Sequence, residues 1–177
     1  MKKLFFAAII AALLLSFAVC AAESAMPEEE IATAAIGDVT FSFTNEQEYY
    51  DVVYRHPDEF ELEIKEDTDR VRHILCYHVE GFEPCAVKLV VSWTKNYATP
   101  EERLKDVIFI DQVVTEEING VSWAIGTKTR PSNTSVIIYS CAAGGYVYTF
   151  SFSSDHPDAF DYAEFAQVFA KNVTIRE

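Results

Sequence analysis

Four residues of the types that bind metal ions lie close together near the middle of the chain. The stretch RHILCYHVEGFEPC contains His73, Cys76, His78 and Cys85, and zinc prefers such nitrogen and sulfur donors. Along a strand, Cys76 and His78 would share one face and His73 would lie on the other, because side chains alternate. A zinc site therefore requires the following turn to return Cys85 beneath Cys76 and His78, which makes these three residues the metal-ligand candidates.

The cysteines offer a second chemistry, a disulfide bond. Three of them lie beyond the N-terminal segment, namely Cys76, Cys85 and Cys141, and an oxidising compartment would permit one bridge with one thiol left over. A turn centred near Phe82 would place Cys85 opposite about Val79 rather than opposite Cys76. Cys141 and Cys76 are therefore equally plausible disulfide partners of Cys85, and the sequence does not decide between them. All three thiols could also be free.

An enzyme is the alternative that these residues raise. Cys141 precedes the glycines of AAGGY, but a cysteine nucleophile needs a nearby base and usually a helix N-terminus that lowers its pKa. A turn explains these glycines, and no helix follows directly. The alternative is a metal- or thiol-dependent hydrolase that uses His73, Cys76, His78, Cys85 and Cys141. No phosphate-binding loop, dinucleotide fingerprint or Gly-x-Ser-x-Gly elbow is present, so we assign no catalytic residue and no cofactor and favour a non-enzymatic protein.

The N-terminal segment has the layout of a secretory signal peptide. Two lysines precede an uncharged apolar run from Leu4 to Val19, and small residues follow. We expect residues 1–21 to be removed on export, which would place the protein outside the cytoplasmic membrane of a bacterium, secreted or in the cell envelope. In the alternative, Cys20 becomes the lipid-carrying first residue of a lipoprotein and tethers the protein to the membrane.

Composition predicts one acidic domain with a packed core. Half of the residues are apolar and 14% are aromatic, well above disordered chains. Residues 22–37 include three consecutive glutamates without a clear period, which indicates a flexible acidic leader before a single domain at residues 38–177. Loss of the two signal lysines takes the formal charge from −14 to −16. Such a charge disfavours nucleic acid and anionic lipid as partners.

Most of the domain is predicted to be antiparallel sheet. Residues 39–44 and 60–65 alternate apolar and polar side chains, as strands with one solvated face do. Residues 70–79 and 85–93 are rich in β-branched and aromatic side chains and flank turn residues, which predicts a hairpin near the middle of the sheet.

Turn residues predict two further hairpins. They are centred on Asn119-Gly120 and Gly144-Gly145, because these residues tolerate positive φ. The segment from Glu46 to His56 fits a helix or a strand equally well.

Two helices complete the predicted fold. Thr99 and Glu102 form a capping box with a proline at the first helical position, which predicts a short helix through about Lys105. A final helix over residues 158–171 is predicted, with Asp155 and the proline two residues later as its cap and first turn. Its apolar face comprises Tyr162, Phe165, Ala166, Phe169 and Ala170. The expected fold class is α+β, an antiparallel sheet of successive hairpins packed by the C-terminal helix and one short internal helix.

The C-terminal half resembles a known family. From about Ile118 onward, an Asn-Gly hairpin bearing Trp123, a strand, a Gly-Gly turn, a Tyr-x-Phe-x-Phe strand and an aromatic helix follow one another, ending in Val173-Thr174-Ile175. This order resembles proteins of PsbP-like fold, which include the photosystem II extrinsic PsbP protein, a Ran-binding nuclear import factor and many small exported bacterial proteins. The resemblance implies a non-enzymatic adaptor or binding module and carries over no catalytic residue.

These expectations together describe an exported binding protein. Its partner would be a protein or a small ligand outside the cytoplasmic membrane. Most of the two tryptophans and nine tyrosines are expected to pack in the core, and a few exposed ones could form an aromatic recognition patch, because Tyr and Trp bury much area at small entropic cost.

Overall fold

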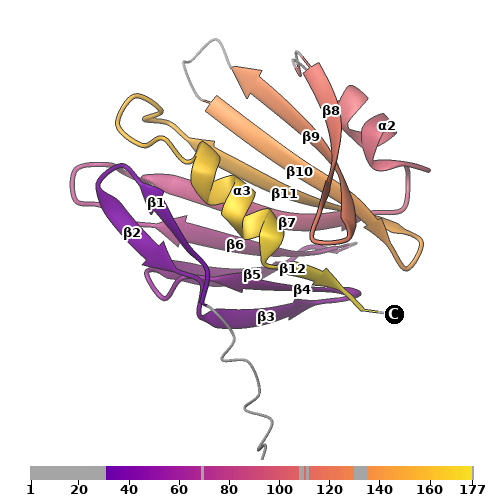
Figure 1. The fold of residues 1–177 in the computed structure, drawn as a ribbon, viewed down its shortest axis with the longest axis horizontal. Helices are drawn as coiled ribbons and strands as arrows, with labels where there is room; N and C mark the ends of the chain where they lie inside the picture. Colours follow the sequence, from indigo (N-terminus) through magenta and orange to yellow (C-terminus); the bar gives the residue numbers. More distant parts are fainter. Residues whose placement is uncertain (1–30, 69, 108–109, 111, 130–134, 177) are drawn as a thin grey trace, which may run out of the picture. The chain divides into compact units, whose positions relative to one another are not determined.

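A seven-stranded antiparallel sheet dominates the fold, with the strand order β5-β6-β7-β11-β10-β9-β8 (Figure 1). In chain order its strands are β5 (Phe60–Glu66), β6 (Val71–Tyr77), β7 (Val87–Thr94), β8 (Gln112–Ile118), β9 (Val121–Thr129), β10 (Ser135–Ala143) and β11 (Tyr146–Ser154). The computed structural model describes residues 31–68, 70–107, 110, 112–129 and 135–176, which belong to one unit that begins at Ile31. The expected signal segment 1–21 and Cys20 lie outside the described residues.

Two smaller sheets and two helices make up the rest of the regular secondary structure among the described residues. β1 (Thr33–Ile36) and β2 (Val39–Ser42) form a hairpin, and a three-stranded sheet has the order β12-β4-β3. Its strands are β3 (Asn45–Tyr49), β4 (Val52–His56) and β12 (Val173–Ile175), and the helices are α2 (Pro100–Lys105) and α3 (Ala163–Lys171). Neither helix is long and apolar enough to cross a membrane.

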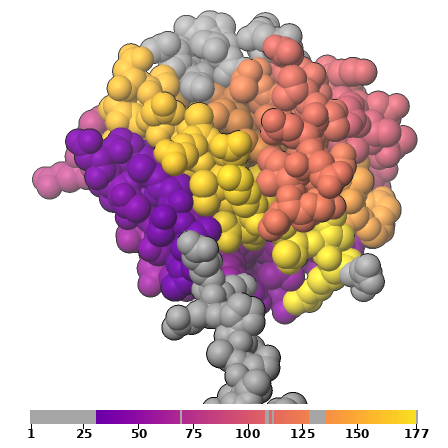
Figure 2. Space-filling model, viewed as in Figure 1, coloured from indigo at the N-terminus to yellow at the C-terminus, as the bar shows by residue number. Residues whose placement is uncertain are grey.

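Alternation along the strands divides the large sheet into two faces. On one face, Trp123 of β9, Tyr139 of β10 and Phe150 of β11 are buried with Phe165 and Phe169 of α3. The rings meet edge to face or tilted, with centroids 5.8 Å apart for Trp123 and Tyr139 and 5.7 Å apart for Phe150 and Phe169, the arrangements that aromatic pairs prefer. Figure 2 shows α3 lying between the β1–β2 hairpin and the strands β8 and β9 on this side. We call this the core face.

The opposite face of the large sheet is only partly covered. Leu104 of α2 is fully buried against Ala124, Val136 and Ile138, which alternate with the core-face residues of β9 and β10. The part of this face nearer to β5, β6 and β7 carries two open clefts. We call it the open face, and the side chains that could meet a ligand lie there.

Several local predictions are confirmed. The Asn119-Gly120 turn has φ values of 56° and 76°, and the Gly144-Gly145 turn has 55° and 81°, and both connect paired strands. β6 pairs with β7 as the predicted hairpin. Thr99 caps α2, because its side chain accepts the Glu102 N–H.

The α+β fold class is wrong, because the described residues are mostly β-strand. The ambiguous segment from Glu46 to His56 is a hairpin, β3–β4, with Tyr50 at φ 55° in its tip. Its second strand also pairs with β12, where Val173 lies opposite Tyr54. These pairings join segments at opposite ends of the chain, so periodicity within either segment did not reveal the extra sheet.

Two predicted boundaries are also wrong. Strand β1 lies inside the expected leader 22–37, where Ala34 and Ile36 are buried and the strand pairs with β2, so these small apolar residues belong to the core. The final helix begins at Ala163 rather than residue 158, and the Ala163 N–H donates to the Asp161 side chain instead of Asp155 providing the cap. Residues 156–160 form a turn, in which the His156 carbonyl accepts two backbone N–H groups.

Candidate functional site

The five residues of the enzyme alternative do not converge. His73 is buried on the core face, where its Nδ1 lies 2.7 Å from the Tyr54 hydroxyl. His78 Nε2 lies 3.5 Å from a carboxylate oxygen of Glu61. The sulfur atom of Cys76 contacts the sulfur atom of Cys85. Within the described residues, no group of three or more His, Cys, Asp or Glu side chains could hold a metal ion. The structure therefore does not assemble the zinc candidates Cys76, His78 and Cys85 into a site.

Cys141 is not placed as a nucleophile. It is fully buried on the core face, and this burial raises the pKa of its thiol to about 12. A thiol must ionise to attack a substrate, so Cys141 is inert in this position. Its strand partner in the sheet is Tyr148, and it contributes to the aromatic core.

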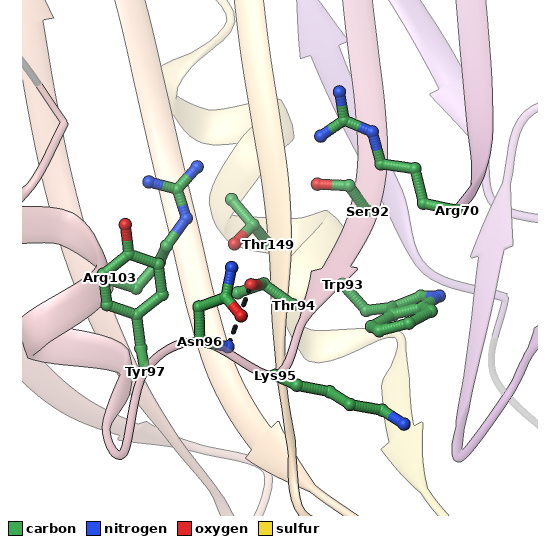
Figure 3. A pocket seen from close by; sticks show the side chains of 9 residues that line it. All are labelled: Arg70, Ser92, Trp93, Thr94, Lys95, Asn96, Tyr97, Arg103 and Thr149. Carbon is green, nitrogen blue, oxygen red and sulfur yellow. Dashed lines mark hydrogen bonds between the residues drawn. The ribbon is translucent and has the colours of Figure 1, made fainter. Parts of the chain in front are cut away.

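A cleft of about 390 Å³ opens on the open face, beside the end of β7. Figure 3 shows the side chains that line it. Its polar lining includes Ser92, Thr94 and Thr149. Ser92 of β7 and Thr149 of β11 are direct cross-strand neighbours, so strand register brings their hydroxyl groups together.

The floor of the cleft is ordered by hydrogen bonds. The Ser140 hydroxyl donates to the Tyr148 carbonyl at 2.8 Å and lies 3.4 Å from the Thr149 hydroxyl. The Asn96 N–H donates to the Thr94 side-chain oxygen at 3.2 Å, which is the dashed line in Figure 3. This local bond turns the chain as it leaves β7, a common role of threonine hydroxyls.

Three cationic residues from separate parts of the chain line the cleft, namely Arg70, Lys95 and Arg103. Arg103 comes from α2, and its guanidinium carbon lies 5.4 Å from the centre of the Tyr97 ring. Lys95 Nζ lies 4.8 Å from the centre of the Tyr146 ring. These cation–π contacts hold the charged groups in position without neutralising them.

The three cationic residues have few carboxylate partners. Arg70 lies 3.8 Å from an Asp67 oxygen that is much closer, at 2.6 Å, to Arg72. In the part of the chain that the structure describes, neither Lys95 nor Arg103 has a carboxylate within ion-pair distance. Among the described residues, the cleft lining includes no Asp or Glu, although the chain has 28 acidic and 14 basic residues. The cleft is therefore a local site of positive charge on an acidic protein.

An aromatic cluster lies at the end of β7 on the core-face side of the sheet, where Trp93 pairs with Tyr148. Trp93 lines the cleft, and its ring contacts Tyr50 and Tyr146 at centroid distances of 5.7 and 4.9 Å. Tyr50 is 53% exposed. The neighbouring Asp51 anchors this hairpin tip, since it accepts the Tyr148 hydroxyl at 2.8 Å. The predicted aromatic recognition patch has a physical candidate in these three rings.

Sequence reasoning missed the cations of the cleft. It named the tyrosines and tryptophans but singled out no lysine or arginine. The segment SWTKNY, residues 92–97, carried a usable signal, because a lysine lies among aromatic and hydroxyl side chains at a strand end of an acidic chain. Arg70 and Arg103 had no such signal, since only the fold brings them to this segment.

Comparisons with known proteins bear on the fold alone. No protein-family model and no curated protein matches the chain. Among solved structures, the fold is similar to a crystal structure at 1.50 Å resolution of a protein from Bacteroides thetaiotaomicron VPI-5482, with a TM-score of 0.51 and 12% sequence identity. The match covers 72% of this chain and 46% of that protein, so the chain spans about half the length of its structural neighbour.

Proposed function

We propose that this protein is an exported, non-enzymatic binding protein that takes a small anionic ligand in the cleft beside β7. The observation that carries the proposal is the presence of Arg70, Lys95 and Arg103 without any carboxylate among the described residues of the lining. Export rests on the signal-like N-terminal segment. The rest of the strongly acidic surface repels anions, so anion binding would be confined to this cleft.

The lining suits a carboxylate or a phosphate group. Arginine presents a planar fork of N–H donors that matches two oxygens of either group. Ser92 and Thr149 add neutral hydroxyl donors on the floor. Tyr97 offers a ring surface for the apolar part of a ligand. A volume of about 390 Å³ lies at the lower end of small-molecule sites, which favours a ligand of small size.

Matched ligands test the charge requirement. Isothermal titration of the mature protein would use glucuronate, glucose 6-phosphate and citrate as anions, with glucose as the uncharged counterpart of the first two. We expect at least one anion to bind, and glucose to bind at least about tenfold more weakly, because one charge-assisted hydrogen bond contributes about 1.5–3 kcal/mol. Equal binding of glucose, or no binding of any of the three anions at millimolar concentration, would refute the proposal.

Matched variants test the location. Arg103→Gln and Lys95→Gln each remove one cleft charge, and we expect each to weaken anion binding by about tenfold. Lys65→Gln makes the same change of charge on β5, outside this cleft, and should leave the affinity within about twofold. If all three variants bind alike, the ligand does not occupy the proposed cleft.

A further inference from the structure

Two thiols meet at the end of the β6–β7 hairpin. The sulfur atoms of Cys76 and Cys85 lie 2.8 Å apart, and both residues are free thiols in the structure. A disulfide bond holds two sulfur atoms at about 2.05 Å, so a bridge requires a movement of less than about 1 Å. From this geometry we infer that Cys76 and Cys85 form a disulfide bond in the mature protein.

The backbone around Cys85 holds it in place for this bond. The Ala86 N–H donates to the carbonyl of Tyr77, the residue after Cys76, across the hairpin at 2.9 Å. The Ala86 carbonyl accepts the Ser154 hydroxyl at 2.6 Å. Because both polar groups of the next residue are hydrogen bonded, the position of the Cys85 sulfur is set by the sheet rather than by a loose loop.

The third cysteine is excluded by the sheet. Cys141 is buried on the core face, whereas Cys76 pairs with Lys88 and lies on the open face. Of the two pairings of Cys85 that the sequence left open, only the one with Cys76 brings sulfur atoms into contact. The bridge would leave Cys141 as one buried free thiol.

The exposure of the two thiols sets the order of the reaction. Both thiols line a second cleft of about 400 Å³, in which Cys76 is partly exposed and Cys85 is buried. Burial raises the pKa of the Cys85 thiol to about 12, so this thiol is a poor first nucleophile. Cys76 is therefore the thiol that meets an external oxidant of the disulfide class, such as oxidised glutathione.

The exchange is balanced in two steps. The Cys76 thiolate attacks one sulfur of the oxidant, forms a mixed disulfide and releases the other sulfur as a thiolate. Cys85 then attacks the Cys76 sulfur, forms the intramolecular bond and releases the second half of the oxidant as a thiolate. The two protein thiols lose two electrons, which the oxidant gains, and their two protons end on the two released thiols.

The disulfide bond would stabilise the turn between β6 and β7. It encloses the turn that carries Phe82, whose ring contacts His156 and Phe160 at centroid distances of 5.0 and 4.9 Å. Locking this turn therefore also holds the segment that leads from β11 to α3. The expected benefit is stability of this turn, independent of whether the anion cleft binds a ligand.

Mass spectrometry tests the bond and its order. Reduced protein would be treated with oxidised glutathione, alkylated and cleaved at glutamate, since Glu80 and Glu83 separate the two cysteines. We expect a cross-linked pair of fragments containing Cys76 and Cys85, with Cys141 alkylated only after unfolding. Alkylation of both Cys76 and Cys85, or a bridge to Cys141, would overturn the inference.

Single variants test the same bond independently. Cys85→Ser should trap one glutathionyl group on Cys76, whereas Cys76→Ser should leave buried Cys85 unmodified in the native protein. A reductant should lower the Tm of the oxidised wild type by about 5–10 °C and leave the Tm of either variant unchanged. A wild-type Tm that does not respond to the reductant would contradict a structural bridge, even if a variant failed to fold.

Discussion

Two buried histidines should make the folded state sensitive to mild acid. His56 and His73 are only 4% and 5% exposed. Burial lowers the pKa of both side chains, and the nearby His56 lowers that of His73 further, while the hydrogen bond to the Pro57 carbonyl partly opposes the effect for His56. Protonation would place a positive charge inside the protein, where His56 Nε2 is buried without a hydrogen-bond partner among the described residues and the nearby Asp58 carboxylate offsets the charge only in part.

The sign and size of the effect follow from proton linkage. Because both folded pKa values lie below the unfolded value of about 6.5, the unfolded chain binds more protons as the pH falls below that value. Stability is therefore complete above pH 6.5 and is lost as the pH falls toward the folded pKa values. Each histidine lowers the free energy of unfolding by at most about 1.2 kcal/mol between pH 7.0 and 5.5, and the two together by at most about 2.5 kcal/mol.

Urea unfolding followed by tryptophan fluorescence measures this loss. Trp123 is buried in the core beside Phe150, so its emission reports the global transition. The free energy of unfolding would be determined at pH 7.0 and 5.5 at constant ionic strength. We expect His56→Gln and His73→Gln each to remove about half of the pH dependence, and the double variant to remove most of it.

A control separates proton linkage from simple destabilisation. Tyr54→Phe removes the hydroxyl that lies 2.7 Å from His73 Nδ1 and should lower stability by about 1 kcal/mol at both pH values. It keeps both imidazoles, so the difference between the two pH values should persist. The reasoning is refuted if the double histidine variant loses as much stability between pH 7.0 and 5.5 as the wild type does.

Three substitutions test the packing and the support of the cleft. A Cβ atom at Gly144 would lie 2.1 Å from Asp51 Oδ2 at a φ of +55°, so Gly144→Ala should destabilise the fold by about 1–3 kcal/mol in urea unfolding. Thr99→Ala removes the acceptor of the Glu102 N–H and should cost about 1 kcal/mol; it should also weaken anion binding, because α2 carries a cleft arginine. Phe150→Ala empties a fully buried position and should cost about 3–5 kcal/mol, and a cost below 1 kcal/mol would contradict the described core.

The features predicted correctly depend on short segments. The turns at Asn119-Gly120 and Gly144-Gly145 need residues that accept positive φ, and both adopt it. The cap at Thr99 needs only a side chain three residues before Glu102. The parity argument that separates His73 from Cys76 also holds, because alternation is a property of a single strand.

The wrong predictions concern segments whose structure depends on pairing with another strand. The sequence pattern from Glu46 to His56 is compatible with a helix and with a strand. In the structure the second half of this segment pairs with β12, and it is therefore a strand. Residues 33–36 are too small and too few to predict a strand alone, yet pairing with β2 buries Ala34 and Ile36. An α+β fold was expected because these two small sheets were not visible in local patterns.

The sequence by itself determined the hairpin turns, the cap of α2, the alternation of buried side chains and the acidic charge of the chain, since each depends on composition or on neighbouring residues. Only the tertiary structure decided that Arg70, Lys95 and Arg103 share one cleft and that Cys76 meets Cys85 while Cys141 lies across the sheet. The reason is physical: strand order and register place side chains that are far apart in the chain on one face, and local preferences do not encode either of them.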